Sequence, residues 1–261
     1  MDVGIAASFS KEPDPWLSKK RTAIRRKTLA LLRMETMADK KALIVWGGWD
    51  GHQPEQVAEI FEKALTEKGF SVEVANTLDA YTDEAKLKSL DLIVPVWTMS
   101  KITSEQLNPL LAAVKSGVGI AGCHGGMCDS FREATEYQFM TGGQWVAHPG
   151  NDGVEYTVEI TDPDHFITQN APMVFPIKSE QYYLHVDPAV RVLATTRFPI
   201  ADGPHVKNGP VDMPTVWTKY YGEGRVFYTA LGHHADIIAQ PEVLGLCTRG
   251  LLWAARAEEL L

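Results

Sequence analysis

Three histidine-containing segments stand out as places where this sequence could do chemistry. They cover residues 47–52, 122–126 and 231–234, and each combines histidine with glycine. Glycine lets the backbone turn sharply or approach a ligand closely, while imidazole binds metals and transfers protons near neutral pH. Each segment follows a short apolar run that is typical of a buried strand. We therefore expect these histidines at strand ends, where open α/β sheets bind their ligands.

Residues 122–126 have the form of a nucleophile elbow, which is a strained strand-to-helix turn that exposes its central side chain. The central residue here is His124. Imidazole is a good metal ligand and general base but a poor persistent nucleophile. Cys123 is offset by one position, so in a strand it faces the other side of the sheet, and we interpret it as a packed thiol.

Residues 141–148 carry side chains suited to a sugar, namely Gln144, Trp145 and His148. An indole ring can stack on a sugar face while Gln and His bind the hydroxyl groups. For Trp145, burial in the core is the alternative interpretation. In the first histidine segment, Trp49 and His52 are candidates for binding the same substrate.

Residues 179–187 contain Glu180, Tyr182 and His185. If they form one straight strand, Glu180 and Tyr182 share a face and His185 lies on the other. We therefore predict Glu180 and Tyr182 as pocket residues. The remaining candidates are weaker. We expect His165 and His205, which lie in loops, to have solvated side chains. His234 and Asp236, which lie near the last histidine segment, are second-tier candidates.

Several histidines and a glutamate suit zinc or another divalent ion that takes nitrogen and oxygen ligands. The preferred ligands are His124, His148 and His233, with Glu180 in reserve, and His52 would then orient the substrate. His124, His233 and Glu180 are also the candidate catalytic acid and base groups. No Gly-x-Gly-x-x-Gly or Walker sequence occurs, so we expect no nucleotide cofactor.

Alternating strands and helices must position these residues. Apolar runs predict strands at residues 42–46, 71–75, 92–96 and 118–121. Between them, apolar periodicity and a Thr103/Gln106 capping box predict helices after Pro54, over 83–90 and over 103–115. Wholly apolar strands that alternate with helices indicate an α/β fold, a doubly wound, flavodoxin-like, mostly parallel sheet with helices on both faces.

The second half of the chain adds further strands. Period-two alternation predicts a half-exposed strand at 155–160, and apolar content predicts another at 190–195. Residues 215–219 and 225–231 bracket a glycine-containing turn and predict a hairpin. A closing helix is expected over 244–261. We predict two parts, a basic N-terminal extension over 1–40 outside the core fold and one domain over 41–261.

Composition excludes several classes of protein. The 261 residues carry a net charge of −8, and residues 1–40 alone carry +4, which leaves −12 for residues 41–261. An acidic body repels phosphate, so we expect no nucleic-acid partner. No apolar stretch is long enough to span a membrane, and three cysteines make no disulfide framework, so we expect a reducing, cytoplasmic environment.

Residues 41–256 resemble the ThuA-like family of trehalose-utilisation proteins, within the class I glutamine amidotransferase-like superfamily. The matching motifs are VWGGWDGH at 45–52, GIAGCHGG at 119–126, TGGQWVAH at 141–148, SEQYY at 179–183 and FYTALGH at 227–233. The resemblance implies a flavodoxin-like sheet in which His124 occupies the position of the amidotransferase cysteine. Glutamine hydrolysis through a thioester is therefore not expected.

The resemblance also implies a function in sugar utilisation. Family members are associated with trehalose and related disaccharides, alongside an oxidoreductase that makes 3-keto sugars. We expect a keto-glycoside lyase, hydrolase or isomerase, because a keto group acidifies the neighbouring C–H and lets a positioned base start elimination or isomerisation. A non-catalytic carbohydrate-binding or regulatory protein is the alternative. A small sugar substrate, functional association with such an oxidoreductase and a homo-oligomer are the expected partners.

Overall fold

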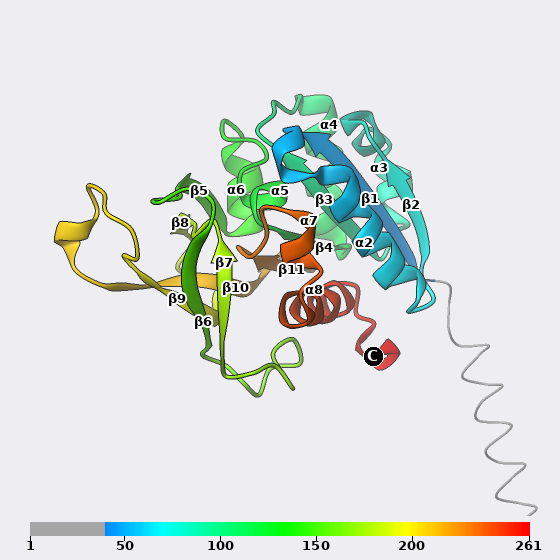
Figure 1. Ribbon diagram of the computed structural model, residues 1–261. Coiled ribbons are helices and arrows are strands. Elements are labelled where there is room, and N and C mark those ends of the chain that lie inside the picture. The colour runs from blue at the N-terminus through cyan, green and yellow to red at the C-terminus, as the bar shows by residue number, and fades with distance from the viewer. Residues whose placement is uncertain (1–39) are drawn as a thin grey trace, which may run out of the picture. The chain divides into compact units, whose positions relative to one another are not determined.

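The computed structural model describes residues 40–261, which form an α/β unit built on a nine-stranded sheet in the order β2-β1-β3-β4-β11-β10-β9-β6-β7 (Figure 1). Its strands are β1 (Lys41–Gly48), β2 (Ser71–Ala75), β3 (Leu92–Thr98), β4 (Gly119–Cys123), β6 (Val154–Ile160), β7 (Val174–Ser179), β9 (Arg191–Phe198), β10 (Val211–Tyr221) and β11 (Gly224–Thr229). A separate two-stranded sheet pairs β5 (Gly143–Ala147) with β8 (Tyr183–Val186).

The helices are α2 (Pro54–Thr66), α3 (Glu84–Lys88), α4 (Ser104–Ser116), α5 (Gly125–Cys128), α6 (Thr135–Thr141), α7 (Ala235–Ile238) and α8 (Pro241–Ala254). Helices α2 and α8 pack on one face of the sheet, and α3, α4 and α6 pack on the other. The Thr103/Gln106 capping box opens α4 as predicted, with the Thr103 backbone N–H donating to Gln106 Oε1 at 3.1 Å.

The half of the sheet formed by β2, β1, β3, β4 and β11 is entirely parallel. Residues 42–45 of β1 and 119–123 of β4 are buried throughout, which explains their unbroken apolar character. The prediction of a doubly wound α/β sheet with helices on both faces is confirmed. All the parallel strands end at one edge of the sheet, where the loops after β1, β4 and β11 meet.

The other half is antiparallel. Strands β10, β9, β6 and β7 follow β11 in order, each antiparallel to its neighbour. Strand β6 alternates exposed and buried residues, as its period-two pattern predicts. The predicted hairpin is confirmed as the antiparallel pair β10 and β11.

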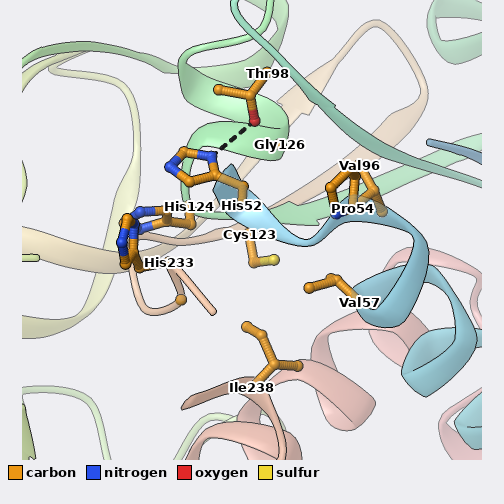
Figure 2. Close-up of a pocket in the computed structure, with 11 residues that line it drawn as sticks. His52, Pro54, Val57, Val96, Thr98, Cys123, His124, Gly126, His233 and Ile238 are labelled. Carbon is orange, nitrogen blue, oxygen red and sulfur yellow. Dashed lines mark hydrogen bonds between the residues drawn. The ribbon is translucent and has the colours of Figure 1, made fainter. Parts of the chain in front are cut away.

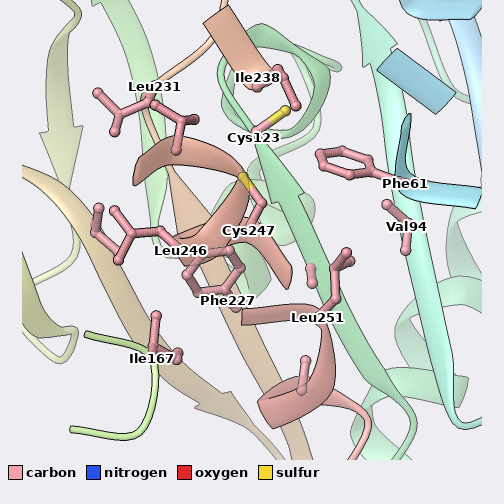
Figure 3. Close-up of a cluster of buried hydrophobic side chains, with 14 of the residues drawn as sticks. Phe61, Val94, Cys123, Ile167, Phe227, Leu231, Ile238, Leu246, Cys247 and Leu251 are labelled. Atoms are coloured by element: carbon pink, nitrogen blue, oxygen red, sulfur yellow. The ribbon is translucent and has the colours of Figure 1, made fainter. Parts of the chain in front are cut away.

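Helix α8 packs against the parallel half of the sheet through a buried apolar cluster (Figure 3). Phe227 of β11 lies against α8 so closely that a Cβ on Gly250 would come within 2.2 Å of its Cε1 atom. Cys123 and Cys247 lie in the same cluster, and burial raises the pKa of the Cys123 thiol to about 12. Cys123 is therefore a packed thiol, as predicted.

The structure also corrects several expectations. The closing helix ends at Ala254 rather than at residue 261. Four elements between residues 135 and 186 were not predicted, namely α6, β5, β7 and β8. His165 is buried at 9% exposure against Trp253, so the expectation of a solvated side chain was wrong. The prediction of an extension over residues 1–40 falls almost wholly outside the described residues.

Within residues 40–261, no helix combines the length and the apolar character that crossing a membrane requires.

Candidate functional site

Three of the predicted histidines meet at the edge where the parallel strands end. His52 closes a short turn after β1, His124 follows β4 directly, and His233 lies in the loop after β11. Figure 2 shows the three histidines on one side of a pocket and apolar side chains, including Val57 and Ile238, on the other. The ring centroid of His52 lies 4.9 Å from that of His124 and 5.2 Å from that of His233.

The backbone at His124 has the strained geometry that the elbow motif predicts. Its φ and ψ are 49° and −138°, a region that non-glycine residues rarely adopt. The backbone N–H of His124 donates to the Thr229 carbonyl at 2.7 Å, and the Tyr228 hydroxyl donates to the His124 carbonyl at 3.1 Å. His233 also has a positive φ, of 94°. Strained backbone at both histidines favours a functional role for them.

Two glycines allow the histidine rings to approach one another. A Cβ on Gly125 would lie 2.5 Å from His52 Cε1, and a Cβ on Gly232 would lie 2.6 Å from the Cβ of His124. Both distances are too short for any side chain. The glycines of the sequence motif are therefore needed for close packing of the rings.

Glu180 directly follows β7, in the antiparallel half of the sheet. It is the only carboxylate in the cluster that it forms with His52, His124 and His233. Its Oε2 atom lies 3.1 Å from His124 Nε2 and 3.3 Å from His233 Nδ1. The residue is 5% exposed. The Tyr156 hydroxyl donates to the Glu180 carbonyl at 3.1 Å, and the Ser179 hydroxyl donates to the Gly232 carbonyl at 2.6 Å. These two bonds fix Glu180 beside the loop that carries His233.

The hydrogen bonds of His124 determine which ring nitrogen faces the cluster. Nδ1 lies 2.8 Å from the Ala230 carbonyl, which only accepts, so Nδ1 carries the proton. In the neutral ring, Nε2 then directs a lone pair at Glu180 Oε2. Two acceptors at 3.1 Å repel each other unless a proton or a cation lies between them.

Burial opposes the proton at that position. It lowers the pKa of His124, because the loss of hydration outweighs the opposing effects of Glu180 and the Ala230 carbonyl. Burial likewise lowers the pKa of His52 to about 3, and the neighbouring His124 and His233 add to this effect. Both rings are therefore neutral at pH 7, which is the form that binds metals.

The pKa values of Glu180 and His233 shift in the direction that favours their charged forms. Burial acts to raise the pKa of Glu180, but when His124 and His233 carry protons on the nitrogens that face it, their contacts outweigh burial and hold the pKa well below its usual range. Burial acts to lower the pKa of His233, but the contact with Glu180 and the charges of Asp152 and Asp236 raise it above its ordinary value.

The four side chains could together hold a metal ion. His52, His124, Glu180 and His233 each offer one ligand atom, and these atoms all lie within 4.8 Å of one another. Ligands about 2.0–2.1 Å from a tetrahedral zinc ion are roughly 3.3 Å apart, which is close to both Glu180 distances. Nδ1 of His233 is buried and has no hydrogen-bond partner among residues 40–261. The residues therefore fit a divalent cation.

His148, a predicted metal ligand, lies outside this group of four. Its Nε2 atom is 3.7 Å from Glu180 Oε1, the oxygen that faces away from His124, and its side chain is 30% exposed. Its ring stacks with Tyr182, which in turn stacks on His124 with a centroid distance of 3.9 Å. His52, which sequence reasoning assigned to the substrate, takes the place in the group that His148 was expected to hold.

The aromatic residues predicted to bind a substrate flank the cluster on two sides. Trp49 is 45% exposed, and its ring lies 4.8 Å from that of His52. On the other side, Trp145 of β5 lies 5.4 Å from His148 and beneath the guanidinium of Arg132.

Gln144 is not brought to the cluster by any described contact. Its side-chain amide donates to the Trp145 carbonyl at 2.9 Å, within the same strand, and its register partner on β8 is His185. Glu180 and Tyr182 are buried and His185 is exposed, but residues 180–182 lie between β7 and β8, so the single straight strand from which their shared face was inferred does not form. Sequence reasoning also missed Thr98, whose hydroxyl lies 3.0 Å from His52 Nδ1, because its position at the end of β3 was the only signal.

The enclosed space beneath the histidines is small and mostly apolar. It is lined by His52, His124, His233, Thr98, three glycine or proline residues and the side chains of Val57, Val96, Cys123 and Ile238 (Figure 2). Its volume of about 20 Å³ holds about one water molecule. A sugar ring cannot enter a space of this volume.

Comparison with known proteins supports the resemblance drawn from the motifs. The family model ThuA, described as trehalose utilisation, matches residues 41–254. A search among curated proteins finds no match to the sequence.

The fold is similar to those of several solved structures. A ThuA-like protein from Bacteroides uniformis is 20% identical with a TM-score of 0.66, over 83% of this chain and 91% of that one. A ThuA-like protein from Parabacteroides merdae is 19% identical with a TM-score of 0.65, over 83% and 90%. A cytoplasmic protein from Salmonella typhimurium is 12% identical with a TM-score of 0.58, over 82% and 98%. At these identities the similarity concerns the fold alone.

Proposed function

The chain belongs to the ThuA family, described as trehalose utilisation, and from this premise we propose that it is a sugar-processing enzyme that depends on a divalent metal. The substrate class is a disaccharide such as trehalose or its 3-keto derivative. The metal would be held by His52, His124, Glu180 and His233, with zinc the first candidate because the donors are nitrogen and carboxylate oxygen.

One observation carries this proposal, namely the contact between His124 and Glu180. Nδ1 of His124 donates a hydrogen bond to the Ala230 carbonyl. A lone pair on Nε2 therefore faces Glu180 Oε2 at 3.1 Å inside a buried pocket. A histidine that ligates a metal through one nitrogen commonly donates from the other to a backbone carbonyl. His124 is therefore oriented as such a ligand.

A bound divalent ion would polarise a substrate carbonyl or lower the pKa of a bound water. The chain's own residues would orient the sugar around it. Trp49 offers an exposed ring on one side of the cluster, and His148 lies on the other with Nε2 free to contact a substrate hydroxyl. For a 3-keto-glycoside, a base at this rim could remove the acidified proton next to the carbonyl.

The same proposal includes a cytoplasmic location and a functional association with an oxidoreductase that makes 3-keto sugars. All three cysteines of the sequence are free thiols in the structure, as expected in a reducing compartment.

The test begins with metal analysis of protein purified without an affinity tag. We expect a stoichiometric divalent ion, and turnover of trehalose or a 3-keto-glycoside that is lost on chelation and restored by the ion. Glu180→Gln keeps the size of the side chain but removes its charge, and should weaken both metal binding and turnover at least 100-fold. His185→Ala, which alters an exposed histidine on β8, is the matched control and should change neither.

Two outcomes contradict the proposal. If no stoichiometric metal is found and added metal gives no activity, the metal-dependent enzyme is excluded. His124→Ala separates an enzyme from a non-catalytic carbohydrate-binding protein: lost turnover with sugar affinity retained supports the enzyme, whereas unaltered behaviour with every keto-glycoside supports the binding protein.

A further inference from the structure

His233 belongs to a second group of potential ligands on the exposed side of the cluster. Ligand atoms of Asp152, His233 and His234 all lie within 4.8 Å of one another. His233 is the only residue shared by this outer group and the inner group that contains Glu180. We infer that His233 bridges two cations, and that Asp152, His233 and His234 hold a second divalent ion beside the first. This inference rests on the metal centre of the proposed function.

The two nitrogens of His233 point in different directions, and each faces a carboxylate. Nδ1 lies 3.3 Å from Glu180 Oε2, and Nε2 lies 3.9 Å from Asp152 Oδ2. The His233 side chain is only 7% exposed, and its Nδ1 is a buried atom without a hydrogen-bond partner among residues 40–261. A buried polar atom without a partner is costly. A cation between Nδ1 and Glu180 would satisfy it, and Nε2 on the other side of the ring would then be available to a second cation beside Asp152.

Asp152 is oriented for such a role. Its Oδ1 atom accepts a hydrogen bond from the Gly153 backbone N–H at 2.8 Å, which leaves Oδ2 as the oxygen directed at His233. The gap of 3.9 Å between Oδ2 and Nε2 is too wide for a hydrogen bond but spans two ligands of one ion. His234 adds a second imidazole, with its ring centroid 4.0 Å from that of His233.

The charge around the outer group also favours a cation. Asp152 places a carboxylate beside His233 Nε2, and no lysine or arginine among the described residues forms an ion pair with Asp152. Two imidazoles and a carboxylate suit zinc, cobalt(II) or manganese(II). Because Asp152 is 51% exposed, an outer ion would keep open positions for water or for hydroxyl groups of the substrate. With both nitrogens bound the ring carries no proton, so the second ion displaces one proton from His233.

The number of bound ions tests this inference. The full-length, metal-free protein is titrated with zinc or cobalt(II), and bound metal is counted by calorimetry and by native mass spectrometry. We expect two ions per chain for the wild type. Asp152→Asn should retain the inner ion and weaken the outer one at least 100-fold, so that at metal concentrations just sufficient to saturate both wild-type sites only one ion is bound. Asp164→Asn alters another exposed aspartate and should keep two.

The outcomes separate this inference from the proposed function. Two ions in the wild type and one in both Asp152→Asn and His234→Gln support the bridged pair. One ion in the wild type and one in Asp152→Asn overturns the second site but leaves the inner metal centre intact. Two ions in Asp152→Asn would place the second ion elsewhere on the surface and also overturn it. Absence of any bound ion contradicts both proposals. Because Asp152 is exposed on a turn, its replacement should leave the thermal midpoint of the metal-free protein unchanged.

Discussion

The parallel and antiparallel halves of the main sheet contribute differently to the candidate site. The parallel half supplies His52, His124 and His233, all from loops at the carboxyl ends of its strands. The antiparallel half supplies Glu180, which follows β7, the outermost strand of that half. Neutral imidazoles alone carry no charge to match a divalent cation. The site is therefore complete only where the two halves meet.

The halves should differ first in how much stability their cores provide. Phe227 of β11 is 1% exposed and packs against α8, whereas Phe175 lies on β7, an edge strand with one neighbour. Phe227→Ala should lower the free energy of unfolding by about 3–5 kcal/mol. Phe175→Ala should cost less, because the edge can relax around the cavity.

Urea unfolding of both variants measures this difference. Phe139→Ala, at a residue that is 58% exposed, is the surface control and should cost less than about 1 kcal/mol. An equal loss for Phe227→Ala and Phe175→Ala would show that the two halves stabilise the fold alike.

The parallel half could be predicted from sequence because its strands are buried on both faces. Unbroken apolar runs at β1, β3 and β4 indicated strands without any need for tertiary information. The glycine-flanked histidines at the strand ends followed from the same reasoning. His124 and His233 were therefore placed correctly at one edge, and His52 was placed beside them.

The antiparallel half could not be predicted to the same extent. Strand β7 has six residues that alternate between exposed and buried, so it lacks the unbroken apolar run that marks the parallel strands. Strands β5 and β8 have five and four residues and pair only with each other, so they carry no long pattern. His148 lies outside the group of four for the same reason, because only tertiary structure fixes where the loop after β5 lies.

The halves should also titrate in separate pH ranges in the metal-free protein. Below the ordinary histidine pKa of 6.5, the unfolded chain binds protons that buried His52 and His124 do not. Stability is thus lost as pH falls from 6.5 toward the His52 pKa of about 3, by roughly 2 kcal/mol between pH 7 and 5. The lowered pKa of Glu180 adds a further loss that begins only near its ordinary value of 4.5.

His233 acts in the opposite sense. Because its pKa is raised in the folded state, its contribution is fully present below pH 6.5 and is lost as pH rises through the raised value. Unfolding free energies measured from pH 4 to 8 in the presence of a chelator test this scheme. His52→Gln should flatten the slope between pH 6.5 and 4.5. Glu180→Gln should flatten the slope below pH 4.5 and should also reduce the loss above pH 6.5, because Glu180 raises the pKa of His233. A wild-type profile that is level between pH 7 and 5 would contradict the assignment.

The smallest expected difference concerns the two tryptophans that flank the cluster. Trp49 belongs to the parallel half and contacts His52, whereas Trp145 belongs to β5 and lies beneath Arg132. If both rings contact the sugar, replacing either one by Ala should raise KM about fivefold, or roughly 1 kcal/mol, with kcat and metal content nearly unchanged. Tyr220→Ala, at an exposed aromatic residue on β10, is the control. An effect of Trp49→Ala alone would confine sugar binding to the parallel half and make the β5–β8 sheet only a support for His148 and Tyr182.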